Sequence, residues 1–263
     1  MNFEQKIIWI TGASSGIGEE LAYSFSKRKS QLILSARRVD ELQRVKANCA
    51  YPELVTVVPL DLEDYKSVSG IASTVLSSHK NIDILIHNGG VSQRSVVAET
   101  DLHVYEKLMN VNYMGAVALT LAVLPRMIAH NSGHIVVLSS MAGKFEIPLR
   151  SGYAAAKHAL HGFFETLRAE VYDNNIKVLM VCPGFIKTQV SVNALTGSGN
   201  KQSVMDDGQL KGILPQVLSE KIISAISKNK LQLIIGGSET RGVLIKRLFP
   251  GLFAKIIRNK KVT

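Results

Sequence analysis

The stretch KIIWITGASSGIGEE, residues 6–20, joins an apolar run to a glycine-rich turn and then to a helical pattern. Its glycine spacing is G-x-x-x-G-x-G, not the G-x-G-x-x-G of many dinucleotide-binding turns. Glycine lets the backbone turn tightly and approach a phosphate, whose charge is met by N–H groups at the next helix start. A purely structural turn is the alternative. We favour a nucleotide site that includes Gly12, Ser14, Ser15, Gly16, Ile17 and Gly18.

The same strand-then-helix order repeats along the chain. Apolar runs occupy residues 6–11, 31–36, 54–60, 82–87, 134–139, 177–182 and 231–236, and helical patterns lie between them, the longest over 102–129. Most of these runs are nearly continuous in apolar character, as strands are when both faces of a sheet are covered. The sequence therefore predicts an α/β protein with a doubly wound Rossmann fold. Helices should cover both faces of a seven-stranded, mainly parallel sheet.

Composition limits the number of domains and the kind of partner. The 263 residues, 46% of them hydrophobic, suit a single domain over residues 1–240. The net charge of +10 is concentrated in residues 241–263, which hold seven Lys or Arg and no Asp or Glu. Without them the formal charge is +3, so we expect no nucleic-acid partner.

The basic tail has its own pattern. Apolar residues recur at helical spacing, and Pro250–Gly251 should divide the tail into two short helices. We expect residues 241–263 to form an amphipathic extension packed on the domain or on a partner subunit. A peripheral membrane contact, or a cover over an apolar substrate cleft, is the alternative.

Other features bear on location and metals. Cys49 and Cys182 fit no disulfide framework, and no run reaches the roughly 18 apolar residues of a membrane span, so we expect a cytoplasmic protein. His158 and His161 lie three residues apart but lack a third ligand. We therefore expect no metal site, and a helix-surface or interface role for this pair.

Polar residues follow six of the predicted strands, where the ligands of open α/β sheets bind. The ends are Thr11–Gly12, Arg37, Asp61–Leu62, His87 to Gly90, Ser139–Ser140 and Pro183–Gly184. At the second end, Arg37 and Arg38 stand where a carboxylate would bind the 2′-hydroxyl of NAD. Guanidinium groups suit a 2′-phosphate, so NADP(H) is preferred and NAD(H) remains the alternative. The alternative interpretation is that both arginines are solvated surface charges.

Tyr153 and Lys157, in SGYAAAKHAL (151–160), are four residues apart and share one helix face. A nearby ammonium favours the phenolate, so Lys157 is expected to lower the pKa of Tyr153 and make it an acid/base group. An amphipathic helix with an exposed lysine is the alternative, because chance matches to this spacing are common.

The motifs TGASSGIG, HNGG, NVNYMG, LSS and YAAAK, in this order, resemble the short-chain dehydrogenase/reductase family over roughly residues 5–190. LILSARRVDEL, HNGGVSQRS and AAKHALHGFF are most similar to its dehydrogenase/reductase member 7 subgroup. The resemblance implies a catalytic tetrad of Asn112, Ser140, Tyr153 and Lys157. In it Ser140 binds the substrate oxygen, Tyr153 is the acid/base, Lys157 holds the nicotinamide ribose, and Asn112 orders a water in a proton relay.

The resemblance also implies cofactor contacts. Asp61 and the adjacent Leu62 would lie at the adenine, and Asn88, Gly89 and Gly90 at the ribose side. Residues after the sixth strand would flank the nicotinamide and diphosphate: Pro183, Gly184, Ile186 and Thr188. Three positions depart from the family pattern: His87 in place of an asparagine, Gly89 in place of an alanine, and Ala156 in place of a small polar residue.

These features predict an NADP(H)-dependent oxidoreductase that interconverts an alcohol and a ketone or aldehyde. A non-catalytic NADP(H)-binding scaffold, or an epimerase or dehydratase on the same fold, is the alternative. The substrate would be a small carbonyl or alcohol compound recognised by residues 141–151 and 189–212. By resemblance, helices 102–129 and 153–173 would form a homodimer or homotetramer.

Overall fold

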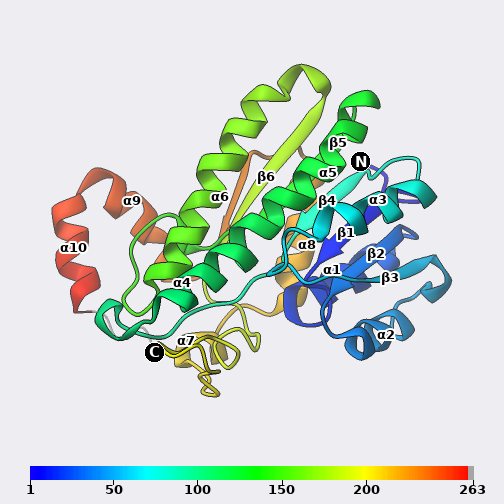
Figure 1. The fold of residues 1–263 in the computed structure, drawn as a ribbon. Helices are drawn as coiled ribbons and strands as arrows, with labels where there is room; N and C mark the ends of the chain where they lie inside the picture. Colours follow the sequence, from blue (N-terminus) through cyan, green and yellow to red (C-terminus); the bar gives the residue numbers. More distant parts are fainter. Residues whose placement is uncertain (260–263) are drawn as a thin grey trace.

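The computed structural model describes residues 1–259, which are built around one sheet (Figure 1). The strands are β1 Ile7–Thr11, β2 Gln31–Ala36, β3 Val55–Pro59, β4 Ile84–His87, β5 Gly133–Leu138, β6 Ile176–Pro183 and β7 Gln232–Ile235. Their order is β3-β2-β1-β4-β5-β6-β7, and every neighbouring pair is parallel. The predicted Rossmann fold is confirmed, and all seven strands end at the same edge of the sheet.

Side chains of successive strand residues alternate between two cores. On β1, Ile8 and Ile10 belong to one core and Trp9 to the other, and all three are fully buried. Helices α1 Gly16–Ser26, α2 Val39–Ala47 and α8 Pro215–Ser227 cover the first face. Helices α3 Val68–Ser78, α5 Gly115–Ala129 and α6 Ser151–Glu170 cover the second. Strands covered on both sides explain the continuous apolar runs of the sequence.

The helical stretch 102–129 is not a regular α-helix throughout. It consists of α4 Leu102–Met109, a π-helical turn Asn110–Met114, and α5. By length and composition this run could cross a membrane, which corrects the expectation that no segment would qualify. In this fold, however, Leu119, Val123 and Met127 of α5 are fully buried against the sheet.

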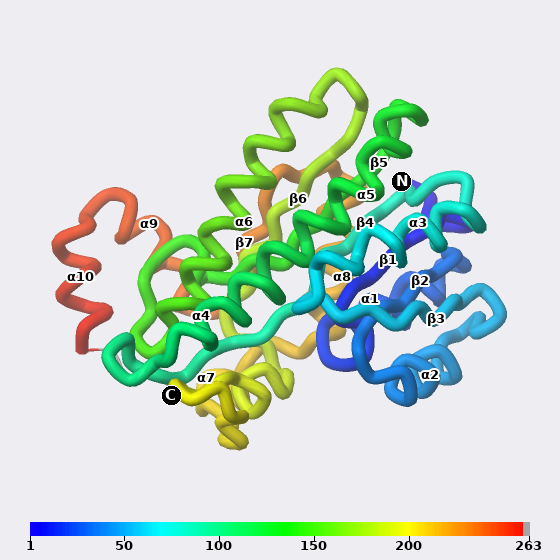
Figure 2. The backbone as a smooth tube through the Cα atoms, viewed as in Figure 1, coloured from blue at the N-terminus to red at the C-terminus, as the bar shows by residue number. Residues whose placement is uncertain are grey.

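Two helices at the end of the described chain stand beside the domain, next to the start of α6 (Figures 1 and 2). They are α9 Arg241–Leu248 and α10 Pro250–Arg258, so the chain breaks at Pro250 as expected; a short helix, α7 Asp207–Leu210, lies elsewhere after β6. Phe253 and Ile257 of α10 are buried with Met141, Phe145 and Cys182, and the rings of Phe145 and Phe253 are 5.1 Å apart. Residues 260–263 of the predicted extension lie outside the described residues.

Candidate active site

The glycine turn after β1 has the geometry that the sequence predicts. Gly12 and Gly16 adopt φ angles of +64° and +60°. Residues other than glycine rarely adopt this backbone conformation. The N-cap residue Ser15 makes no side-chain hydrogen bond to the first-turn N–H groups of α1. Those N–H groups and the positive end of the helix dipole suit a pyrophosphate, so the turn fits a dinucleotide.

Asn88 fastens this turn to the end of β4. Its Nδ2 donates to Thr11 O at 3.1 Å and to Gly12 O at 3.0 Å. In return, Thr11 Oγ1 accepts the backbone N–H groups of Asn88 and Gly89, both at 3.1 Å. The side-chain amide of Asn88 is therefore engaged in shaping the glycine turn, which lies between β1 and α1.

The two arginines after β2 lie at the same edge of the sheet. Both side chains are exposed, and Arg38 Nη2 donates to Ser14 Oγ at 3.2 Å and to Ser15 Oγ at 3.4 Å. The structure thus brings Arg38 to the glycine turn itself. Arg37 directly follows the last residue of β2.

The cofactor residues expected from the other strand ends fall into two groups. Ile17, Asn88, Gly90, Pro183, Gly184, Ile186 and Thr188 line one cleft. Asp61 lies outside that lining, where its Oδ1 accepts Glu63 N at 3.0 Å. Leu62 packs so closely against Gly89 that a Cβ there would lie 2.4 Å from Leu62 Cδ1. The predicted cofactor residues are thus divided between the lining of this cleft and the segments after β2 and β3 outside it.

Three members of the predicted tetrad line this same cleft. Ser140 follows β5, and its Oγ accepts Ala142 N at 3.2 Å, which starts a short 3₁₀ helix at Met141–Gly143. Tyr153 and Lys157 lie one turn apart on α6, with Lys157 Nζ 5.6 Å from the centre of the Tyr153 ring. The Ser140 hydroxyl opposes the rise that burial causes in the pKa of Tyr153. Spacing along α6 and the end of β5 thus bring the three side chains together.

Burial affects the ionisation of both members of the pair. It raises the pKa of Tyr153, and the groups that oppose this rise are Ser140, Arg150 and Arg94. Burial also lowers the pKa of Lys157 to about 8, and its Nζ donates to Leu138 O at 2.7 Å. That Lys157 lowers the pKa of Tyr153 stays a prediction.

Asn112 lies in the π-helical turn between α4 and α5, a distortion that often marks functional sites. Its Nδ2 donates to Val91 O at 3.0 Å and to Leu108 O at 2.9 Å, and its Oδ1 accepts Val91 N at 3.0 Å. Both amide protons are used, so the side chain supports the segment after β4. A Cβ on Gly90 would meet Asn112 Oδ1 at 2.6 Å, which places Asn112 directly behind the cleft.

His87, the departure from the family pattern, has a structural role. Its Nε2 contacts Thr120 Oγ1 at 2.7 Å, and burial lowers its pKa to about 3, so the ring is neutral. Thr120 Oγ1 donates to Ala116 O at 2.8 Å, so His87 Nε2 is the donor to Thr120. This hydrogen bond joins β4 to α5.

His161 corrects another expectation, because it is buried and not on the helix surface. Its Nδ1 donates to Glu165 Oε1 at 2.7 Å, and its Nε2 lies 3.0 Å from Ser139 Oγ. Burial lowers its pKa. The exposed His158 instead contacts its own helix backbone, with Nδ1 2.9 Å from Ala154 O. Within residues 1–259 no group of three His, Cys, Asp or Glu side chains is placed to hold a metal ion.

Sequence reasoning missed the charged residues of the cleft. Arg94 and Arg150 both line it, and each binds the carboxylate of Asp206. Arg150 and Asp206 lie within the segments expected to determine specificity, and Arg94 lies in the motif HNGGVSQRS. Their position in segments that follow strand ends could have indicated that these charged residues lie near the site. No local pattern in the sequence indicates that Arg94 and Arg150 form ion pairs with Asp206.

Comparison with known proteins agrees with this geometry. The sequence model of the short chain dehydrogenase family matches residues 6–198. The chain belongs to this family. It is 44% identical over 265 residues to a Drosophila melanogaster protein named dehydrogenase/reductase SDR family protein 7-like, which covers 98% of this chain and 81% of that protein. The family assignment makes the protein an oxidoreductase that acts on CH–OH groups with NAD or NADP.

Solved structures of short-chain dehydrogenases have the same fold. One from Streptomyces avermitilis is 29% identical, with a TM-score of 0.82, and covers 98% of this chain and 100% of its own. Another, from Burkholderia phymatum in complex with NAD, is 21% identical, with a TM-score of 0.83 and 96% of each chain covered. The likeness to the second shows a shared fold alone.

Proposed function

We propose that this short-chain dehydrogenase is an NADP(H)-dependent enzyme that interconverts an alcohol and a ketone or aldehyde, with Tyr153 as the acid/base. The observation that carries the proposal is the meeting of Ser140, Tyr153 and Lys157 in one cleft beside the glycine turn. A non-catalytic scaffold could bind the cofactor without these three side chains. An epimerase or dehydratase of this fold would leave the oxidation state of its cofactor unchanged after each turnover.

The chain's own groups divide the work around the substrate oxygen. A nicotinamide held in this cleft would supply the hydride for reduction and accept it in oxidation. The Ser140 hydroxyl orients and polarises the substrate oxygen, and Tyr153, which lines the same cleft, gives that oxygen a proton during reduction and takes it back during oxidation. Lys157, anchored on Leu138 O, has further protons to donate to the nicotinamide ribose.

The cleft lining indicates a largely apolar substrate with few polar groups. Its apolar walls come mainly from the segment after β5, the segment after β6, and α10: Met141, Phe145, Ile147, Phe185, Val190 and Ile257. A panel of aliphatic, aromatic and polycyclic ketones and aldehydes, tested with NADPH and NADH, is the decisive experiment. Oxidation of NADPH that depends on a panel member supports the proposal. Product formation without net oxidation would indicate the epimerase or dehydratase alternative, and cofactor binding without turnover the scaffold.

The preference for NADP(H) is supported by the two guanidinium groups after β2. We expect Arg37→Asp and Arg38→Gln each to weaken NADPH binding about 10-fold or more relative to NADH, because each removes a charge-assisted contact with the 2′-phosphate. Dissociation constants for both cofactors measure the effect. Lys230→Asp is the control, because this exposed lysine precedes β7 at the opposite edge of the sheet. Equal weakening of NADPH and NADH by the arginine variants would contradict the phosphate assignment.

A homodimer or homotetramer through α4, α5 and α6 also remains our proposal. It is supported by exposed apolar side chains on the outer face of α5, where Leu121 is 59% exposed and Ile128 is 40% exposed. Sedimentation equilibrium of the chain and of its Leu121→Arg variant tests it. A monomer at micromolar concentration would exclude this interface.

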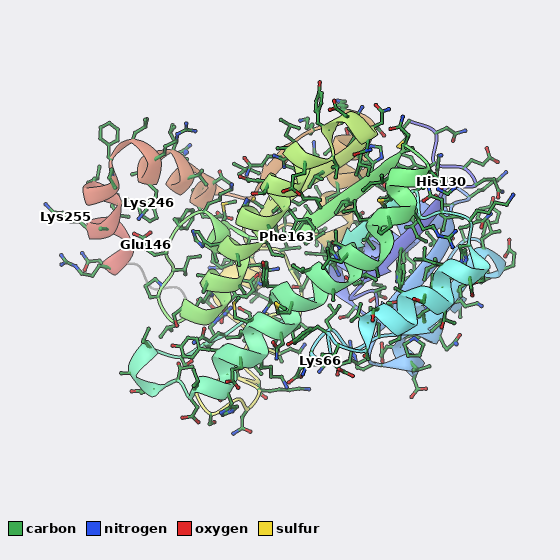
Figure 3. All side chains as sticks on the ribbon, turned by 45° about the horizontal axis from the view of Figure 1, so that its top comes forward. Lys66, His130, Glu146, Phe163, Lys246 and Lys255 are labelled. Carbon is green, nitrogen blue, oxygen red and sulfur yellow. The ribbon has the colours of Figure 1, made fainter. Side chains whose placement is uncertain are left out.

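We further propose a cytoplasmic protein that touches a membrane through α9 and α10. Apolar side chains of this hairpin are exposed: Leu244, Leu248, Phe249, Leu252 and Ile256. Basic residues lie among them, with no acidic residue from Arg241 to Asn259. Figure 3 shows Lys246 facing Glu146, a 2.7 Å ion pair, while Lys255 points away from the domain. Exposed apolar and cationic side chains together suit an anionic lipid surface.

The variant Leu248→Asp/Leu252→Asp is expected to lose at least 10-fold in affinity for vesicles that contain phosphatidylserine, because it puts charge on the apolar surface of the hairpin. Co-sedimentation with vesicles, and cell fractionation of the full chain, measure the effect. Val97→Asp, at a side chain 69% exposed on the domain, is the control. Equal vesicle binding by all three proteins would exclude this contact.

A further inference from the structure

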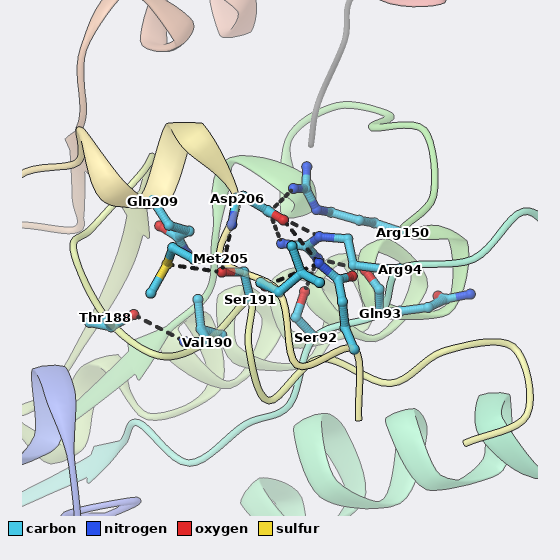
Figure 4. A network of polar contacts seen from close by, with 12 residues as sticks. Ser92, Gln93, Arg94, Arg150, Thr188, Val190, Ser191, Met205, Asp206 and Gln209 are labelled. Atoms are coloured by element: carbon cyan, nitrogen blue, oxygen red, sulfur yellow. Dashed lines mark hydrogen bonds and ion pairs between the residues drawn. The ribbon is translucent and has the colours of Figure 1, made fainter. Parts of the chain in front are cut away.

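A buried ion cluster lies at the edge of the cleft and joins three segments of the chain (Figure 4). Asp206 Oδ2 accepts hydrogen bonds from Arg94 Nε at 3.0 Å and Arg150 Nη2 at 3.1 Å, and Arg94 Nη2 also contacts it. The three side chains are only 5%, 1% and 6% exposed for Arg94, Asp206 and Arg150. Charges so deeply buried are costly unless they are paired, and removal of one partner leaves the other charge uncompensated.

The cluster is attached to the first turn of α6, which carries Tyr153. Arg94 Nη1 donates to Gln93 O at 2.6 Å, and Gln93 Oε1 accepts Gly152 N at 2.8 Å and Tyr153 N at 3.4 Å. Arg150 directly precedes α6, and its carbonyl accepts Ala154 N at 2.7 Å. Arg94, Arg150 and Tyr153 line the same cleft. The two arginines are therefore tied to the backbone of the helical turn that carries Tyr153, and they line the same cleft as its side chain.

Besides the two arginines, the charged side chains among residues 1–259 that line the cleft are Lys157 and Glu239. Lys157, one turn along α6, donates from its ammonium to Leu138 O. The Glu239 carboxylate accepts the backbone N–H groups of Phe185 and Gly237, at 3.1 and 3.0 Å. Burial raises the pKa of Tyr153, and the Ser140 hydroxyl, Arg150 and Arg94 oppose this rise. The two arginines thus add positive charge to the cleft beside that of Lys157.

We propose that Arg94 and Arg150, held in place by Asp206, are positioning residues whose positive field stabilises the phenolate of Tyr153. The inference rests on the proposed function for its catalytic meaning, since a stabilised phenolate matters only if Tyr153 transfers the proton. Asp206 has two opposing effects. It holds the guanidinium groups beside the cleft, and its own negative charge partly offsets their field.

Two substitutions of Arg94 separate charge from shape. Arg94→Gln removes the positive charge, so ionisation of Tyr153 should move to higher pH by about one pH unit. Arg94→Lys keeps the charge and should leave the ionisation near its wild-type position. The measurement is an alkaline titration of tyrosinate ultraviolet absorbance, from which the curve of the same protein carrying Tyr153→Phe is subtracted. The subtraction isolates Tyr153 from the other six tyrosines of the chain.

Asp206→Asn provides the test of sign. It removes the negative charge but keeps a side-chain oxygen that can accept hydrogen bonds from both arginines, so ionisation of Tyr153 should move to lower pH. A cluster that only braced the fold would shift the titration in the same direction for Arg94→Gln and Asp206→Asn, or for neither. Either of those results overturns the inference. The titration needs no turnover, so absence of ketone reduction would refute the proposed function alone, whereas an unmoved titration in an active enzyme would refute the cluster's role alone.

Discussion

Replacing Tyr153 with phenylalanine is expected to lower kcat for carbonyl reduction by about 10²- to 10⁴-fold, the usual contribution of a positioned acid/base group. Phenylalanine keeps the ring under Lys157 Nζ, which lies 5.6 Å from its centre, and removes only the hydroxyl. No hydroxyl then remains to exchange a proton with the substrate oxygen, because Ser140 is too weak an acid to replace it. The glycine turn is untouched, so the dissociation constant for NADPH should change by less than about threefold.

Tyr105→Phe is the matched control for this change. The Tyr105 hydroxyl lies 3.1 Å from Ser151 Oγ, at the first residue of α6, and Tyr105 does not line the cleft. The Tyr105→Phe variant therefore lacks one hydroxyl near the same end of α6 but keeps every residue that lines the cleft. Its kcat should stay within about threefold of wild type. Steady-state kinetics and NADPH titration on both variants give the comparison. A Tyr153→Phe enzyme that kept a tenth or more of wild-type kcat would show that another group transfers the proton.

The fold could be predicted from the sequence because its strands are buried on both faces. Runs such as Ile84–His87, in which every residue is buried, have no polar alternation that would allow an exposed sheet face. Parallel strands end at one edge, so a residue's place after a strand also predicted its place in the site. Ser140, Asn88 and Gly184 follow three different strands and line one cleft for this reason.

The electrostatics of the site could not be predicted in the same way. Helical spacing makes Tyr153 and Lys157 neighbours, but it does not fix the direction of a flexible lysine side chain, and here the ammonium binds Leu138 O. The cleft is also lined by the buried Arg94, whose partner Asp206 lies 112 residues further along the chain. Such a pairing depends on how the segments after β4 and β6 pack together, which no local pattern records.

Gly18→Ala is expected to destabilise the fold and weaken the cofactor site together. A Cβ at residue 18 would lie 2.4 Å from Gly12 O and 2.5 Å from Asn88 Nδ2, closer than real Cβ contacts allow. Because Asn88 Nδ2 and Gly12 O bond each other, the methyl group would separate the end of β4 from the glycine turn. Overpacking of this kind costs about 1–3 kcal/mol in the free energy of unfolding. The turn would also shift under the pyrophosphate, so NADPH affinity should fall about 10-fold or more.

Gly70→Ala is the matched control, with the opposite expected sign. Gly70 is also helical, near the start of α3, but a Cβ there meets no atom within 4 Å. Alanine should raise the free energy of unfolding by about 0.5–1 kcal/mol, since it reduces the freedom of the unfolded chain and favours the helix. Urea unfolding and NADPH titration on both variants measure the two effects. If both substitutions changed the free energy of unfolding and the NADPH affinity in the same way, the close approach of α1 to the ends of β1 and β4 would not contribute to stability or cofactor binding. The glycine spacing of residues 12–18 would then need another explanation.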